Sequence, residues 1–218
     1  MSALTVIWEQ RQLFLDGLLN TIALVGICAA FSLPLGALGA VLLLEAGENV
    51  SRICRAAVDL MRCVPFLLLA YVIYYGLPGI GLRFSAWGAG IVTLVAYNTA
   101  YLVEIFRSAI VALPKDHAEA ARAFGFRPWQ IYRRILFPQV LATSAPIIGN
   151  QLVVMVKDSA LLMIITVQEL SFVANFINTN YFTPFAPFAV AMALYWGLCL
   201  VIEVGVARLG RPRWMRHG

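Results

Sequence analysis

One pair of opposite charges, Lys157 and Asp158, stands in the middle of a long stretch of otherwise uncharged sequence. They are the only charged residues between Arg134 and Glu169. Charged side chains inside a bilayer are costly, and they usually mark a pathway for solute or a paired structural site. Polar neighbours that could act as their partners are Asn150, Gln151 and Ser159. We interpret the five residues as a candidate solute pathway, with the alternative that Lys157 only anchors a helix end at the membrane surface.

Other residue types that carry out chemistry do not form a recognisable site. The four cysteines include no pair spaced for a metal ion or a redox centre, and we expect them to stay reduced. Neither His117 nor His217 has a nucleophile or a set of metal ligands around it. No phosphate-binding loop of the GxxxxGKS/T type occurs. We therefore expect a protein that is not an enzyme and holds no cofactor of its own, so any hydrolysis of ATP must take place on another chain.

The composition is that of an integral membrane protein. Of the 218 residues, 61% are hydrophobic and only 12% are charged, which is too apolar for a soluble domain of average composition. The net charge of +5 does not indicate a nucleic-acid-binding surface, because the basic residues are grouped by loop and not along one polar face. We expect an all-α protein that crosses the lipid bilayer several times and has no nucleic-acid partner.

Mostly uncharged runs divide the chain into about five predicted spans. The predicted spans are residues 17–44, 63–82, 84–103, 135–156 and 185–206. The first run is longer than the core of a signal peptide, so we expect it to remain as a transmembrane helix. Glu45 to Arg62 is predicted to be a charged loop, and residues 104–134 a long polar loop. Residues 1–218 are expected to form a single membrane domain.

Lysine and arginine are distributed unequally between the two sides that these spans define. Thirteen lie in the loop between the first two spans, in the polar loop and in the tail from Arg208. The other three, Arg11, Arg83 and Lys157, lie on the opposite side. Loops rich in these residues usually stay in the cytoplasm. The N-terminus is therefore predicted to be outside, and the polar loop and the C-terminus are predicted to be in the cytoplasm.

The polar loop carries signals for two short helices separated by a tight turn. Asp116 is suited to cap the first helix, with Glu119 reaching back toward the cap as in a capping box. Gly125 follows where the chain must turn, since glycine adopts positive φ at little cost. Pro128 is suited to the first position of the second helix, and Pro138 should end or kink it. Such a polar segment between two hydrophobic spans needs a reason, and we expect the reason to be a soluble partner.

The same loop resembles the EAA signature of the membrane subunits of ATP-binding-cassette (ABC) importers. The family pattern is EAA, three residues, Gly, nine residues and then Ile-x-Leu-Pro. The residues that match it in register are Glu119, Ala120, Ala121, Gly125, Ile135 and Pro138. Phe137 departs from the pattern, which has leucine there. The resemblance implies that this segment is the coupling helix that docks on the ATPase subunit; the alternative is an ordinary amphipathic connector in which Glu119 only caps a helix.

Three further strings resemble the histidine and glutamine permease class of these importers. In KDSALLMIITVQEL the matching residues are Lys157, Asp158, Ser159, Leu161, Glu169 and Leu170. Ala160 departs from that class, which commonly has serine or threonine there. The opening LFLDGLLNTIAL, with Gly17 and Thr21, and the string RCVPFLLLAYVIYYGLP are also similar to it.

The resemblance implies a type I ABC importer transmembrane fold and the function of a permease subunit for a polar amino acid or a relative such as an opine. The implied partners are a dimer of ATP-binding subunits that hold Mg-ATP, a second permease subunit, identical or paralogous, and an extracytoplasmic solute-binding protein. The implied location is the bacterial cytoplasmic (inner) membrane. Alternatives are an importer subunit for another small solute, a structural assembly factor, and a secondary transporter that works without ATP. The last would need acids along its path, for which Asp158, Glu169 and Glu203 qualify.

Overall fold

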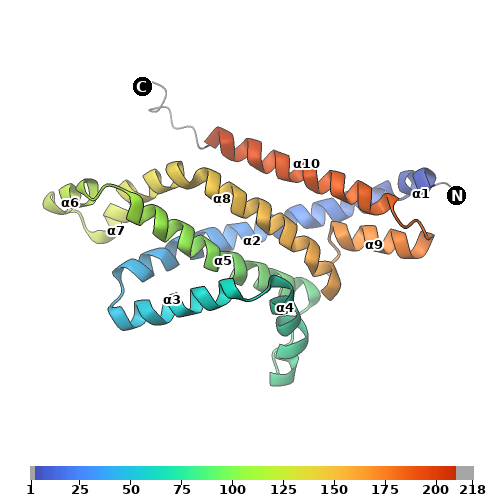
Figure 1. Cartoon of the computed structure of the whole chain (residues 1–218), viewed down its shortest axis with the longest axis horizontal. Helices are drawn as coiled ribbons and strands as arrows, with labels where there is room; N and C mark the ends of the chain where they lie inside the picture. The colour runs from blue at the N-terminus through green and yellow to red at the C-terminus, as the bar shows by residue number, and fades with distance from the viewer. Residues whose placement is uncertain (1–2, 210–218) are drawn as a thin grey trace.

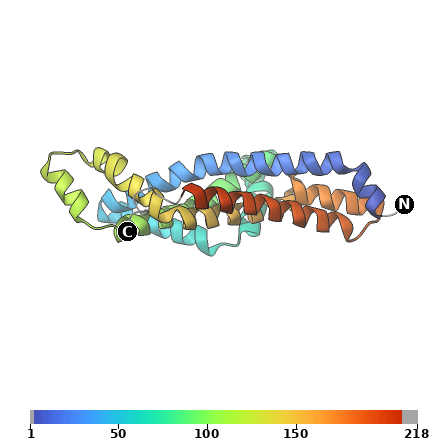
Figure 2. The same ribbon diagram turned by 90° about the horizontal axis from the view of Figure 1, so that it is seen from above.

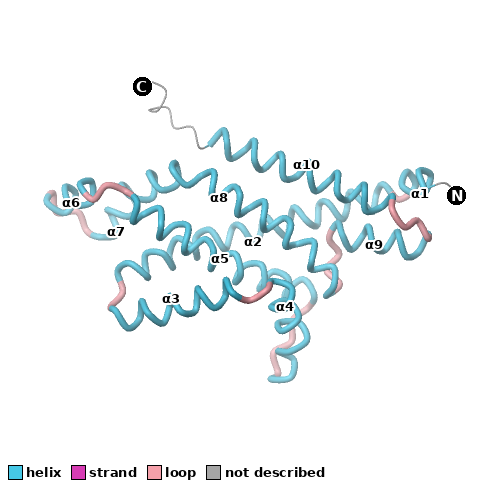
Figure 3. Tube along the Cα trace, viewed as in Figure 1, coloured by secondary structure: helices cyan, strands magenta, loops and turns pink. Residues whose placement is uncertain are grey.

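The computed structural model describes residues 3–209, which form helices and short loops and contain no strand. Figure 1 labels the helices, and Figure 3 shows how short the loops between them are. The α-helices are α1 (Ala3–Glu9), α2 (Arg11–Glu45), α3 (Glu48–Cys63), α4 (Phe66–Tyr71), α5 (Ala86–Ala112), α6 (Asp116–Ala123), α7 (Pro128–Ile131), α8 (Phe137–Ser159), α9 (Leu170–Tyr181) and α10 (Ala186–Leu209). The all-α prediction is confirmed, although most of the arginine-rich tail lies outside the described residues.

Narrower or wider helical turns continue several of these helices. Two π-helical segments (Val72–Gly76 and Tyr132–Leu136) and two 3-10 segments (Leu77–Ile80 and Ala160–Ile165) adjoin the α-helices. The π-helical segment at Tyr132 joins α7 to α8, so the helix that follows the polar loop is continuous.

Within the described residues, four helical segments are long and apolar enough to cross a membrane. They are Arg11–Glu45, Ala86–Ala112, Pro128–Ile165 and Ala186–Arg208. A fifth crossing is available if Glu48–Cys63 and Phe66–Ile80, which meet at an angle of 102°, form one broken span. The prediction of about five transmembrane helices is confirmed.

The bundle is elongated and carries different elements at its two ends (Figures 1 and 2). α1, α9 and the start of α10 lie at one end, on the right of Figure 1. α6 and α7 lie at the other end, on the left. α2 runs between the two ends in contact with α5, α8 and α9, and α4 points away from the bundle. The start of the chain and the polar loop are therefore at opposite ends of the molecule.

Glu45 to Arg62 does not form the predicted charged loop, because the chain is helical as α3 from Glu48 onward. The large apolar residues Val50, Ile53 and Leu60 recur at helical spacing, so this segment is an amphipathic helix. None of the residues of α3 is buried, and the helix lies along α5. The prediction is wrong because a search for uncharged runs misses a helix that carries charge on one face.

The helices approach most closely where α2 crosses α5. A Cβ added at Gly36 would lie 2.5 Å from Cβ of Leu102, and one added at Gly39 would lie 2.5 Å from Cγ2 of Val103. Both distances are too short for a real side chain, so the glycines are needed for this crossing. Small residues have this role in many membrane helix pairs, because they let the two backbones pack closely.

Candidate functional site

The polar loop begins after Ala112 and not at residue 104, because α5 continues nine residues beyond the predicted span. Its remaining part folds as two short helices joined by a turn at Gly125, as the sequence predicts. The N–H of Gly125 donates to the carbonyl of Arg122 (2.9 Å), and the N–H of Phe126 donates to the carbonyl of Ala121 (3.0 Å). These are the two bonds of a Schellman motif, which ends a helix with a residue of positive φ. The φ of Gly125 is 78°. Pro128 is the first residue of α7, also as predicted.

Asp116 does not cap α6. Lys115 occupies the N-cap position without a side-chain hydrogen bond, and Asp116 is the first helical residue. The predicted capping box is therefore wrong, because the helix begins one residue earlier than the box requires. Asp116 and Glu119 instead place two negative charges in the first turn, where the positive end of the helix dipole favours them.

The surface of this loop carries exposed aromatic side chains, of which two are the most exposed. Phe124, at the end of α6, is 84% exposed, and Trp129, in α7, is 61% exposed. Glu119 and Ala120 are also exposed, whereas Ala121 is buried against the bundle. Exposed aromatic residues often anchor a protein interface, so the two aromatics extend the candidate docking surface. The EAA pattern alone did not identify them.

Pro138 does not end the helix that follows the loop. The chain passes through the π-helical turn Tyr132–Leu136 and continues as α8 to Ser159. Proline has no N–H to donate and its ring crowds the preceding turn, and a wider turn can accommodate both effects. Of the two pattern residues in this part, Ile135 is half-buried and Pro138 is exposed.

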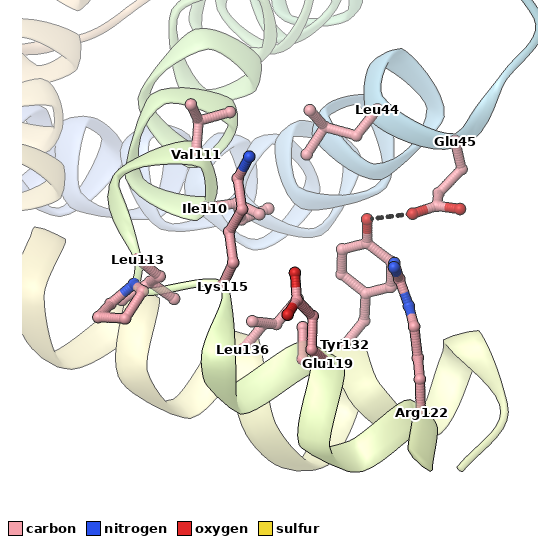
Figure 4. Close-up of a pocket in the computed structure, with 12 residues that line it drawn as sticks. Leu44, Glu45, Ile110, Val111, Leu113, Lys115, Glu119, Arg122, Tyr132 and Leu136 are labelled. Atoms are coloured by element: carbon pink, nitrogen blue, oxygen red, sulfur yellow. Dashed lines mark hydrogen bonds between the residues drawn. The ribbon is translucent and has the colours of Figure 1, made fainter. Parts of the chain in front are cut away.

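A cavity of about 530 Å³ separates α6 from the ends of the spans (Figure 4). Lys115, Glu119 and Arg122 line it on the side of the polar loop. On the opposite side, the hydroxyl of Tyr132 donates a hydrogen bond of 2.7 Å to Oε1 of Glu45, the last residue of α2. The polar loop and α2 are therefore joined by a side-chain hydrogen bond at the edge of this cavity.

The five candidate solute-pathway residues do not form one cluster. Asn150 and Lys157 are exposed, Asp158 is half-buried, and Gln151 and Ser159 are buried. The two buried residues donate their hydrogen bonds to Oδ1 of Asn98 (2.8 Å) and to the carbonyl of Val156 (2.7 Å). They are therefore not the partners of Asp158 that the sequence suggested.

The residues just before Asp158 instead pack with a group of aromatic residues. The Oδ2 atom of Asp158 is buried and has no hydrogen-bond partner among the described residues. Tyr97 packs on the cluster that contains Met155 and Val156, in the turn of α8 before Asp158. The ring of Tyr97 packs edge to face on Phe66 (5.3 Å), and its hydroxyl lies 3.3 Å from that of Tyr101. The Arg62 guanidinium lies 5.4 Å from the centre of the Tyr101 ring.

Sequence reasoning missed this aromatic group. The available signal was the string AYNTAY at positions 96–101, which places polar side chains inside a predicted span. Which of these polar side chains lie near Asp158 depends on how α5 packs on α8. The spacing of residues along one helix does not reveal that packing.

Glu169, a residue of the KDSALLMIITVQEL string, is fully buried and caps α9. Its carboxylate accepts hydrogen bonds from two N–H groups in the first turn of α9 (2.7 and 2.8 Å) and from the hydroxyl of Tyr195. The hydroxyl of Thr21, on α2, accepts a hydrogen bond from the N–H of Leu170 (3.1 Å). A Cβ added at Gly17 would lie 2.9 Å from the side chain of Val173, so α2 and α9 also pack closely. These string residues therefore hold three helices together.

Comparisons with known sequences agree with this architecture. Residues 32–213 match the family described as binding-protein-dependent transport system inner membrane component. The probable glutamine ABC transporter permease GlnM of Bacillus subtilis is 29% identical over 202 residues, which cover 93% of this chain and 94% of that protein. The histidine/lysine/arginine/ornithine transport system permease HisQ of Escherichia coli is 32% identical over 203 residues, covering 88% of this chain and 89% of that protein.

Solved structures have the same fold. A chain in the crystal structure of an amino acid ABC transporter with histidines superposes with a TM-score of 0.86 at 26% identity, covering 97% of this chain and 98% of that chain. A chain of the inward-facing MetNI methionine ABC transporter superposes with a TM-score of 0.81 at 22% identity, covering 93% and 97%. The type I ABC importer transmembrane fold is therefore confirmed.

Proposed function

The chain belongs to the family of binding-protein-dependent transport system inner membrane components, and from this premise we propose that it is the permease subunit of an importer for a polar amino acid. A close relative of an amino acid, such as an opine, is an equivalent solute. The observation that supports this solute class is likeness along nearly the whole chain to permeases named for glutamine and for histidine, lysine, arginine and ornithine.

ATP hydrolysis is assigned to a separate pair of ATPase subunits, which would bind Mg-ATP. The exposed face of α6, with Glu119 and Ala120, and the aromatic side chains of Phe124 and Trp129 supply a docking surface at one end of the bundle. This end also carries Arg127, whereas Arg11 lies near the other end. The excess of basic residues in the polar loop favours a cytoplasmic location for it, where an ATPase can reach it.

The proposed mechanism links the two ends of the molecule. An extracytoplasmic binding protein delivers solute at the end that holds α1 and α9. Closure of the ATPase subunits on ATP then moves α6, and this movement is passed through the helix that carries Glu119 to rock the spans. A bundle of about five spans is a thin wall for a polar solute, so we include a second permease subunit, identical or paralogous, in the assembly. The membrane is taken to be the bacterial inner membrane.

Asp158 is the proposed centre of the solute pathway. A buried carboxylate oxygen without a hydrogen-bond partner is costly in a membrane protein, and a solute that bears an ammonium group would supply one. Tyr97, which packs against the preceding turn of α8, adds an aromatic face and a hydroxyl. Lys157 is exposed next to Asp158, as either a pathway residue or a membrane anchor would be.

Co-purification and reconstitution test the proposed function. The tagged chain should bring down an ATPase, and proteoliposomes containing the complex should take up amino acid only with ATP inside and loaded binding protein outside. Uptake driven by an ion gradient without ATP would contradict the proposal and support a secondary transporter. If no amino acid stimulates the complex, the proposed solute class is wrong, whereas the assignment to the family still holds.

A further inference from the structure

The hydrogen bond between Tyr132 and Glu45 joins two elements that are far apart in the sequence. Tyr132 is 6% exposed and lies in the π-helical turn after α7, and its hydroxyl donates to Oε1 of Glu45 at the end of α2 over 2.7 Å. Figure 4 shows the two side chains meeting at one edge of the cavity, with Arg122 of α6 beside them. A carboxylate at a helix C-terminus is disfavoured by the helix dipole, so Glu45 needs a compensating interaction.

Helix α6 has little direct contact with the spans. Its contacts are mainly with α7 and with the π-helical turn, while the cavity separates it from the ends of α2 and α5. Ala121 of α6 is buried together with Ile131, Tyr132 and Leu136, and Val41 of α2 packs on the same cluster. Ile110 and Leu113, at the end of α5, pack on this cluster too, and residues 113–115 join α6 to α5. A displacement of α6 therefore reaches α5 through the chain itself, and it reaches α2 through the turn that carries Tyr132.

Helix α2 is suited to carry such a displacement across the molecule. Its 35 residues make a helix about 52 Å long, which exceeds the thickness of the hydrocarbon core. In the N-terminal third of α2, the side chain of Asn20 donates a hydrogen bond to the carbonyl of Gln168 (2.8 Å). The hydroxyl of Thr21 accepts a hydrogen bond from the N–H of Leu170. These contacts hold the segment between α8 and α9, which begins two residues after Asp158.

We propose that the hydrogen bond between Tyr132 and Glu45 transmits the movement of α6 to α2, so that Tyr132 is a positioning residue for the coupling of ATP hydrolysis to transport. The proposal rests on the proposed function, since it requires an ATPase docked on α6. The π-helical turn supports it independently, because such turns are often found at functional sites in helices.

Three single variants, one double variant and one control separate this role from a purely structural one. Tyr132→Phe keeps the ring and removes the hydroxyl. Glu45→Ala removes the oxygen that accepts the hydrogen bond from Tyr132, at an exposed position. Glu45→Gln keeps an oxygen that can accept this bond. The control is Tyr181→Phe, which removes a hydroxyl that accepts a hydrogen bond from Gln10 (2.9 Å) at the opposite end of the bundle.

The measurement is uptake per ATP hydrolysed by the complex with its ATPase in proteoliposomes, together with the amount of ATPase that co-purifies. Tyr132→Phe and Glu45→Ala should each lower uptake per ATP about tenfold, a typical coupling effect, with unchanged ATPase content. Glu45→Gln should keep most of the coupling, and the control should match the wild type. The double variant of Tyr132→Phe and Glu45→Ala should be no worse than either single variant, because both remove the same bond.

The possible failures can be told apart. A wild-type chain that binds no ATPase, or that transports without ATP, contradicts the proposed function and the inference with it. If the wild type couples normally and Tyr132→Phe shows the same uptake per ATP, the inference is wrong but the proposed function stands. Additive losses in the double variant, or loss of ATPase from the single variants, also overturn the inference, because they mean separate roles or a docking defect.

Discussion

The side-chain amide of Gln151 donates a hydrogen bond of 2.8 Å to Oδ1 of Asn98 and so joins α8 to α5 inside the bundle. Both residues are buried, and Asn98 donates in turn to the carbonyl of Leu94 (3.0 Å). No water is present in the hydrocarbon core to replace such a bond, so the pair favours one register of the two helices.

Replacing one member of this pair should destabilise the protein. Gln151→Leu leaves Oδ1 of Asn98 without its donor, and we expect a loss of about 1 kcal/mol in the free energy of unfolding. Thermal unfolding of the purified protein in detergent measures it. Combining Gln151→Leu with Asn98→Leu should cost less than the two single changes added together. Strict additivity would show that the bond contributes little.

Glu119→Lys should abolish uptake while the subunit still inserts into the membrane. The substitution places a positive charge in the first turn of α6, where the helix dipole favours negative charge, and it inverts the charge of the exposed docking face. The matched control is Glu48→Lys, in the first turn of exposed helix α3. Uptake assays with quantified membrane levels provide the measurement. Normal uptake and normal ATPase assembly for Glu119→Lys would refute the coupling assignment.

Gly125→Val should reduce the yield of the complex with the ATPase more than Gly125→Ala does. The φ of 78° is costly for residues with a Cβ, about 1–2 kcal/mol, and most unfavourable for a β-branched one. Gly47→Val is a suitable control, because Gly47 has a φ of −57° and open space around it. Equal yields of complex for the wild type, Gly125→Ala and Gly125→Val would mean that the turn is not needed for docking.

The orientation can be tested with single cysteines in a background that lacks the four native cysteines, which are all free thiols. A membrane-impermeant thiol reagent should label Thr179→Cys from outside intact cells. Arg127→Cys should react only after permeabilisation. Both positions are exposed in the folded chain, so the difference reports the side of the membrane. Labelling of Arg127→Cys in intact cells would reverse the predicted topology.

Asp158→Asn should lower solute-stimulated ATPase activity or change the selectivity among amino acids. The change removes the negative charge that would attract an ammonium group but keeps the size of the side chain. Asp16→Asn, at an exposed position on α2, is the matched control. Lys157→Arg tests the neighbour, since an arginine should not restore full function to a pathway lysine. If Asp158→Asn and Lys157→Arg both transport normally, the pair is only a membrane anchor.

Local chemistry predicted the parts of the polar loop that depend on a single residue. Glycine tolerates positive φ, and proline is restricted to a φ that suits the first turn of a helix. Gly125 accordingly lies in the turn with positive φ, and Pro128 is the first residue of α7. The start of α6 was misplaced by one residue, because several residues near Asp116 suit the first turn equally well. The π-helical turn before Pro138 was not predicted, since a proline can end, kink or widen a helix and only the surrounding packing selects among these.

The roles of Asn98 and Glu169 could not be predicted, because both depend on neighbours from other helices. Glu169 was a candidate acid for ion transport. Its carboxylate instead caps α9 and accepts a hydrogen bond from the hydroxyl of Tyr195. The pairing of Asn98 with Gln151 depends on the relative positions of α5 and α8. A pattern read along one segment contains no information about that alignment.

The polar character of α3 has a consequence for the synthesis of the protein. The helix contains five charged residues in 16, and each charge at the centre of a span costs about 2.5–3.5 kcal/mol on insertion scales. The insertion machinery should therefore accept α2 by its own hydrophobicity but not α3. The neighbour on which α3 lies, α5, leaves the ribosome only later. We expect α3 to wait at the membrane surface until α2 and α5 have paired, so that the order of assembly differs from the order of translation.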